Sequence, residues 1–162
     1  MSGNGAAFAA FFDRRHAELS RLAYLLTGDA TVADDLAADA LSRVRGDWPV
    51  LGEDDPAAHA RGLVATLARR NERWVRAGTS HRRAGGTPLE LRAALRRLPH
   101  RRRACVVLRY AFGLTEGEVA RALGITAAAV RSRTARGVRQ LTALLGGSPG
   151  FARAGGGWEA AR

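Results

Sequence analysis

Gly124 stands within a residue spacing that strongly favours a helix-turn-helix. Ala120 lies four residues before Gly124, and Val130 lies six residues after it. Where two helices cross at about 90 to 120° on a short turn, the first helix needs a small residue at the contact. The turn needs a residue that tolerates positive φ, and the second helix needs an apolar anchor. Residues 115–136 meet all three conditions, which are rarely met together by chance.

Local signals on both sides of Gly124 indicate where the two helices begin. Thr115 and Glu118 have the spacing of a capping box, and Thr126 is suited to cap the second helix. The core side of the second helix is expected to contain Val130, Thr134, Val138, Leu141 and Leu145. The opposite face combines arginines, a hydroxyl and methyl groups, which suits a DNA major groove better than the bare solvated face of a bundle. The residues expected to contact DNA are Thr126, Ala128, Arg131, Ser132, Arg133, Arg136 and Arg139.

Charge is distributed unevenly along the chain. The 162 residues have a net charge of +11, and lysine is absent, so arginine supplies the positive charge. The net charge is −5 over residues 1–56, +12 over residues 57–112 and +4 over residues 113–162. An acidic first part followed by a basic remainder indicates two kinds of partner, one of them a polyanion.

Disulfide, metal and membrane chemistry have little support in the sequence. Cys105 is the single cysteine and lies on an apolar helical face, so we expect a buried thiol. Asp34, Asp35 and Asp39 differ in spacing from the DDxxD metal motif of terpenoid synthases. No apolar run reaches the roughly 18 residues of a membrane span, and the N-terminus lacks a signal-peptide pattern. We therefore expect a cytoplasmic protein that uses no metal and no cofactor.

Apolar periodicity predicts three helices in the first part of the chain. The first is expected to run from about Phe8 to a stop at Gly28, and the third to begin after the N-cap Asp55 with Pro56 in its first turn. The second is expected at residues 31–44, with residues 1–6 disordered and residues 46–55 in a loop. The core stripe expected in the first helix contains Phe8, Phe12, Leu19, Leu22 and Leu26, and Phe11 and Leu25 broaden it.

The third helix is dense in arginine and also carries Asn71 and Trp74. An aromatic side chain in a basic groove can stack on unpaired bases. Alternatively, Trp74 can be a core residue beneath a solvated basic face. The sequence by itself leaves both interpretations open.

A break between two domains is expected at residues 77–86, which are small and polar. Thr87 then has the properties of an N-cap, followed by a proline and, at the third helical position, an acid. Helices are expected at residues 89–98 and 100–112, before the helix-turn-helix. The predicted fold class is all-α, with small helical domains at residues 7–76 and 87–145, a linker at residues 77–86 and a flexible tail at residues 146–162.

Over about residues 8–145 the chain resembles the bacterial sigma-70 factors of the extracytoplasmic-function (ECF) group, and in particular the actinobacterial SigE-like type. The segment LPHRRRACVVLRYAFGLTEGEVARALGITAAAVRSRTARGVRQL is similar to the group's LPxRxRxxxxLRY, L-[ST]-x-x-E-[IV]-A, LG-[IV]-[ST] and V-[KR]-S-R-x-x-R-[AG] patterns. The segment AYLLTGDATVADDLAADALSRV is similar to the group's helix that binds the clamp helices of the largest subunit of RNA polymerase.

This resemblance implies a sigma-2-like domain followed by a sigma-4-like domain, and promoter-specific transcription initiation with core RNA polymerase. It implies polymerase contacts from Asp35, Leu36, Asp39 and Arg43, and a further contact with the flap of the second-largest subunit. It places minus-35 binding on the helix-turn-helix, and it assigns minus-10 binding to Arg61, Arg69, Arg70, Asn71, Arg73 and Trp74. An anti-sigma factor is a further partner that the resemblance allows.

Two other classes of protein explain less of the sequence than a sigma factor does. An autonomous helix-turn-helix regulator accounts for residues 98–145 but leaves the acidic second helix and the basic third helix unexplained. A DNA-processing enzyme such as a recombinase needs an activated nucleophile or a carboxylate-metal site. The sequence contains no such pattern, and the four histidines do not have metal-ligand spacing: His16, His59, His81 and His100. We therefore expect no enzymatic activity.

Overall fold

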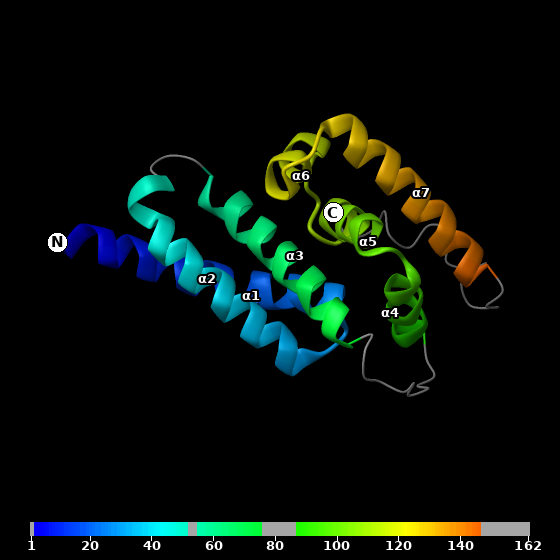
Figure 1. Ribbon diagram of the computed structural model, residues 1–162, viewed down its shortest axis with the longest axis horizontal. Helices are drawn as coiled ribbons and strands as arrows, with labels where there is room; N and C mark the ends of the chain where they lie inside the picture. Colours follow the sequence, from blue (N-terminus) through cyan, green and yellow to red (C-terminus); the bar gives the residue numbers. More distant parts are fainter. Residues whose placement is uncertain (1, 52–54, 76–86, 147–162) are drawn as a thin grey trace.

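The computed structural model describes residues 2–51, 55–75 and 87–146, and it describes side chains for residues 5–51, 55–72 and 90–146 (Figure 1). The described residues form helices joined by short turns, so the predicted all-α class is confirmed. The elements are α1 (Ser2–Thr27), α2 (Ala30–Leu51), α3 (Pro56–Val75), α4 (Thr87–Arg97), α5 (His100–Val106), the π-helical turn η1 (Val107–Ala111), α6 (Glu116–Leu123) and α7 (Ala127–Leu145). We call α1 to α3 the first half and α4 to α7 the second half.

The first half is a three-helix bundle in which α1, α2 and α3 all contact one another. Gly28 ends α1 with a φ of 79°, as its position predicted, and the side chain of Asp29 accepts a hydrogen bond from Val32 N at 3.0 Å to start α2. Asp55 accepts hydrogen bonds from the first backbone amides of α3, which confirms it as the N-cap. The fully buried side chains between these helices are Leu19, Leu22, Leu26, Leu41, Val44 and Val64.

Both α1 and α2 are longer than the sequence predicted. The first helix begins at Ser2 instead of near Phe8, and the second continues through Pro49 to Leu51, where a loop was expected. An aromatic contact between the two helices explains the difference. The ring of Trp48 lies edge-on to Phe8 at 5.3 Å and tilted to Phe11 at 5.2 Å between ring centroids. Such contacts stabilise the added turns beyond what local sequence preferences supply.

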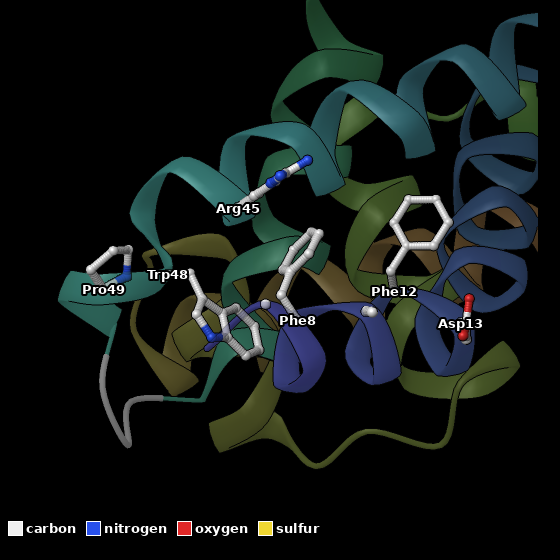
Figure 2. Close-up of a pocket in the computed structure, with 8 residues that line it drawn as sticks. Phe8, Phe12, Asp13, Arg45, Trp48 and Pro49 are labelled. Atoms are coloured by element: carbon white, nitrogen blue, oxygen red, sulfur yellow. The ribbon is translucent and has the colours of Figure 1, made fainter. Parts of the chain in front are cut away.

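The same aromatic contact decides which phenylalanine of α1 is buried. Phe11 is 5% exposed, whereas Phe12, which was assigned to the core stripe, is 36% exposed and stacks on His16. Trp48 approaches α1 from the side of Phe11, so the ring of Phe11 is the one that is buried in the core. Figure 2 shows the resulting open groove, of about 480 Å³, between the start of α1 and the end of α2, with Phe8, Phe12 and Trp48 among its walls.

The second half packs α5 and α7 closely together. Gly137 of α7 makes this possible, because a Cβ added there would lie 2.6 Å from Val106 Cγ2 and 3.4 Å from Leu98 Cδ2. Cys105 is fully buried, as expected, and burial raises the pKa of its thiol. The helix predicted at residues 100–112 is regular only to Val106; it continues as the π-helical turn η1 and ends before Gly113, which has a φ of 64°.

Glu18 of α1 ties α1 to α3 through an ion pair. Its carboxylate lies 2.7 Å from Arg61 Nη2 and 2.6 Å from Arg15 Nη1. Burial acts to raise the pKa of Glu18, but the hydrogen bonds from Arg15 and Arg61 outweigh it, so the pKa lies below its ordinary value. A carboxyl group whose pKa is lower in the folded protein than in the unfolded chain stabilises the fold at pH values above the unfolded pKa. That stability is lost as the pH falls through the folded pKa.

A Glu18→Gln variant is therefore expected to be less stable than the parent by about 1 kcal/mol at pH 7. The difference should shrink as the pH falls below the ordinary pKa of 4.5 for a glutamate, because the parent carboxylate becomes protonated as well. Urea denaturation at pH 7 and at low pH measures both values. Asp13→Asn, at an exposed position on the same helix, is the control. A constant gap at every pH would contradict the expected role of the Glu18 charge.

Candidate nucleic-acid interface

The helix-turn-helix is built by the local interactions that the sequence predicted. Thr115 Oγ1 accepts a hydrogen bond from Glu118 N, and the Glu118 carboxylate accepts one from Thr115 N at 2.7 Å, which completes a capping box. Gly124 ends α6 in the left-handed conformation, with φ 62° and ψ 40°. Thr126 then caps α7 by accepting a hydrogen bond from Ala129 N at 3.2 Å. These interactions fix the angle at which α7 leaves the turn.

The core side of α7 is also as predicted. Val130 of α7 and Val119 of α6 are fully buried. Thr134, Leu141 and Leu145 are buried and Val138 is half-buried. Because this side is fixed against the rest of the second half, the opposite side of α7 faces outward.

The outward face of α7 is a continuous basic surface. The residues exposed there are Thr126, Ala128, Arg131, Ser132, Ala135, Arg136 and Arg139. A helix with its side chains is about 10 to 12 Å in diameter, and a DNA major groove is about 12 Å wide, so α7 can lie in the groove. Six of the seven residues expected to contact DNA lie on this surface. The seventh, Arg133, is half-buried and lines a cleft that faces the first half.

Arg131 already has a partner in the protein. Its guanidinium is 2.9 Å from Glu116 at the start of α6, and that hydrogen bond raises the pKa of Arg131 above its ordinary value. The Arg131 side chain is 69% exposed, so water still surrounds most of it. Glu116 occupies the Nε and Nη2 edge of the guanidinium, so a DNA phosphate or guanine that binds this edge has to replace Glu116.

The α3 residues expected at a minus-10 site do not form one surface in this structure. Arg61 is only 14% exposed, because it pairs with Glu18. Arg69 lines the cleft towards the second half, Arg70 is exposed and Asn71 is half-buried. The side chains of Arg73 and Trp74 lie outside the described residues.

The four α2 residues expected at a polymerase contact do lie together. Asp35 and Leu36 each lie about one helical turn before Asp39, Arg43 lies one turn after it, and none of the four is buried. Arg43 binds Asp39 through two hydrogen bonds, of 2.9 and 3.0 Å. The Asp39–Arg43 pair therefore presents two opposite charges on this surface, and Leu36 adds an apolar side chain to it.

Three residues with large structural roles were not singled out from the sequence: Gly62, Arg103 and Gly137. The two glycines lie inside helices, where glycine is unfavourable by roughly 0.5–1 kcal/mol. A glycine at such a position can therefore indicate that another helix approaches closely there. Arg103 lies among other arginines, and the sequence distinguishes it only as the second arginine of the LPxRxR pattern.

Neither a metal site nor a membrane span stands out in the described part of the chain. Among those residues, no three histidine, cysteine, aspartate or glutamate side chains gather as metal ligands. Within the same residues, no helix combines the length and the apolar character that crossing a bilayer requires.

The fold and the exposed face of α7 define a helix-turn-helix DNA-binding protein of transcription. Residues 89–141 match the family model for sigma-70 region 4. The chain is 33% identical to the ECF RNA polymerase sigma factor SigL of Mycobacterium tuberculosis, over 90% of this chain and 94% of the relative. It is 31% identical to SigM of the same species, over 90% of this chain and 81% of the relative. The chain belongs to the ECF group of RNA polymerase sigma factors.

Solved structures agree with this assignment. CnrH, in a complex with the cytosolic domain of CnrY, matches 91% of this chain and 92% of its own, with 28% identity and a TM-score of 0.70. The sigma factor RpoE of Bartonella quintana, in a complex with the anti-sigma factor NepR, has a TM-score of 0.68 and 19% identity over 88% of this chain and 98% of its own, which supports the fold alone.

The family assignment identifies the function as transcription initiation with core RNA polymerase. The similarity to SigL and SigM spans both halves, whereas an autonomous regulator would need only the second half to match. Sigma factors are a family of non-enzymatic transcription factors. The SigE-like subtype stays a prediction.

Proposed function

We propose that the outward face of α7 binds minus-35 DNA and that α3 binds and opens minus-10 DNA. The exposed arginines on the outward face of α7 support minus-35 binding, because the turn at Gly124 fixes the direction of α7 and these residues face away from the core. The basic character of α3 supports the second, together with exposed Arg70 and the half-exposed Asn71. On this proposal, residues 7–76 and 87–145 are the sigma-2-like and sigma-4-like domains.

The surface of Asp35, Leu36, Asp39 and Arg43 is proposed to bind the clamp helices of the largest polymerase subunit. It carries both charges and an apolar side chain, as stable protein interfaces do at their centre and rim. Core polymerase and chromosomal DNA share the cytoplasm, so we place the protein there. CnrH binds the cytosolic domain of CnrY. A comparable anti-sigma partner is proposed for this chain.

Run-off transcription with core RNA polymerase on genomic fragments tests the proposed function. Transcripts that require the added chain, and that begin at defined positions, are the expected result. Permanganate reactivity of thymines near minus 10 in the same complexes measures strand opening. Binding of a palindromic duplex by the chain without polymerase, and no transcripts with it, would instead support an autonomous regulator.

Arg131→Ala and Arg136→Ala are each expected to weaken promoter binding by about 1 to 3 kcal/mol if the arginine contacts a base. The Arg131 effect should be the smaller one, because the free protein already provides that guanidinium with Glu116 as a partner. Fluorescence anisotropy with labelled promoter and reconstituted holoenzyme measures both values. Arg14→Ala, at an exposed position of α1, is the control. Unchanged affinity in both variants, with circular dichroism equal to the parent, would remove α7 from the minus-35 site.

Asp39→Arg is expected to reduce the recovery of core polymerase in a pull-down by about tenfold, equivalent to about 1.4 kcal/mol. The change reverses one charge at the proposed interface and also places it beside Arg43. Asp13→Arg applies the same charge change to an exposed position on α1 and should recover polymerase as the parent does. Equal recovery by both variants would exclude Asp39 from the interface.

A further inference from the structure

A small cleft lies where α3 of the first half meets α5, α6 and α7 of the second half. Its volume is about 230 Å³. Gly62 of α3 packs against the carbonyl group of Ala122 in α6, and a Cβ added at Gly62 would fall well inside the contact distance of that oxygen. In Figure 1, α6 lies beside α3. The small residues Gly62, Ala65 and Ala104 line part of the cleft and leave its interior open.

A buried arginine fixes α5 against the first half beside this cleft. Arg103 of α5 is 2% exposed, and it donates a hydrogen bond of 2.6 Å to the carbonyl oxygen of Leu26 at the end of α1. It also forms an ion pair with Glu72 of α3 and donates a hydrogen bond of 3.2 Å to Leu98 O. A guanidinium removed from water requires such partners. The walls of the cleft are therefore held in place by contacts outside it.

The charged residues that line the cleft are all basic. Arg69 comes from α3, Arg101 from α5 and Arg133 from α7, and neither aspartate nor glutamate is among the lining residues. Within the part of the chain that the structure describes, no carboxylate lies within ion-pair distance of these three guanidinium groups. Like charges gathered in one cleft repel one another, and a bound anion relieves that repulsion.

A histidine in the same cleft has a nitrogen without a hydrogen-bond partner. The His100 side chain is 10% exposed, and its Nδ1 atom is buried. Among the described residues, the Glu72 carboxylate comes within 3.8 Å of Nδ1, which is too far for a hydrogen bond. A buried polar atom of this kind is commonly satisfied by a bound water or ion. Thr66 of α3 adds a hydroxyl group to the lining, and a hydroxyl can donate to an anion.

We propose that this cleft binds a small phosphorylated ligand through a diphosphate or triphosphate group. Arginine binds phosphate oxygens through paired N–H groups, and three guanidiniums from three helices can surround more than one phosphate. Pockets for drug-sized ligands measure about 300–1,000 Å³, so a cleft of this volume suits a smaller group. An inorganic polyphosphate and the phosphate end of a nucleotide share this chemistry.

The ligand site is a different assignment from the DNA surfaces proposed above. Arg69 and Arg133 belong to both, so a bound ligand and promoter DNA require the same two side chains. Arg101 and His100 have no proposed contact with DNA. Ligand binding is measured on the chain without polymerase or promoter, so failure of this inference would leave the proposed function untouched.

Isothermal titration calorimetry of the full chain with inorganic diphosphate tests the proposal. The expected result is one ligand per chain. Arg101→Gln should weaken binding about tenfold or more, because it removes charge-assisted hydrogen bonds to the ligand. Arg97→Gln is the matched control, because it removes the same charge from an exposed position of α4 outside the cleft and should bind as the parent does.

Arg69→Gln tests the opposite wall and should weaken binding by a similar factor. Circular dichroism verifies that each variant folds. Titrations with inorganic triphosphate, ATP and GTP distinguish the sources of the phosphate group. Equal affinities would assign the site to phosphates alone, and tighter binding of one nucleotide would assign it to that nucleotide; dependence on Arg101 is expected in both cases.

Three results would overturn the proposal. The first is the absence of any binding with a dissociation constant below about 1 mM. The second is equal weakening by Arg101→Gln and Arg97→Gln, which would show general attraction of anions to a basic protein. The third is tighter, Arg101-dependent binding of a short single-stranded DNA than of diphosphate or a nucleotide, which would assign the cleft to the DNA backbone.

Discussion

Replacement of Gly137 by leucine is expected to destabilise the second half by about 3 kcal/mol, at the upper end of what overpacking costs. Even a bare Cβ at this position lies 2.6 Å from Val106 Cγ2 and 3.5 Å from Arg102 O. The backbone of α5 lies behind these atoms, so the helices have to separate to admit a side chain. Since α7 carries the proposed minus-35 surface, promoter binding should fall with stability.

Urea denaturation followed by circular dichroism measures this loss. Gly117→Leu is the matched control, because a Cβ at Gly117 in α6 meets nothing within 4 Å. There the change should be neutral or stabilising by up to about 1 kcal/mol, since leucine is the better helix former. A Gly137→Leu protein as stable as Gly117→Leu would mean that α5 and α7 are not in close contact.

Replacement of Glu72 by alanine is expected to cost about 3 to 5 kcal/mol as long as the halves stay together, because it leaves Arg103 buried without its carboxylate partner. Arg103 can recover water if the halves part, so the contacts between the two halves should be lost before either half unfolds. Small-angle scattering and urea denaturation of the same samples separate these two events.

A double-mutant cycle isolates the ion pair from the other contacts of Arg103. Arg103→Met with Glu72→Ala removes both charges, so the double variant should be less destabilised than the sum of the two single variants. If the destabilisation of the double variant equals the sum of the two single variants, and each single change costs less than about 1 kcal/mol, the result would contradict a buried ion pair. The contact would then resemble an ordinary surface ion pair.

The boundaries of the helix-turn-helix could be predicted because their causes are local. A capping box needs only Thr115 and Glu118, and the turn needs only a glycine at position 124 with Thr126 after it. Each interaction spans a few residues, so the sequence contains all of its partners. The exposed face of α7 could be predicted for the same reason, once Val130 was assigned to the core.

The errors concern features that depend on distant parts of the chain. The extra turns of α1 and α2 depend on Trp48 reaching Phe8, and the exposure of Phe12, which was expected in the core, depends on the side from which Trp48 approaches. Gly62 and Arg103 acquire their roles only when the two halves meet. Periodicity along one helix contains no information about which other helix will cover it.

Gly62 of α3 packs against the carbonyl group of Ala122 in α6, and this contact has a consequence for the order in which a newly made chain assembles. Helix α3 ends at Val75 and α6 ends at Leu123, so the ribosome adds 48 residues between them. At roughly 5 to 20 residues per second, this takes about 2 to 10 s, and N-terminal domains generally fold first during synthesis. Every nascent chain therefore has an interval in which α1 to α3 are complete while the Gly62 side of α3 still faces water.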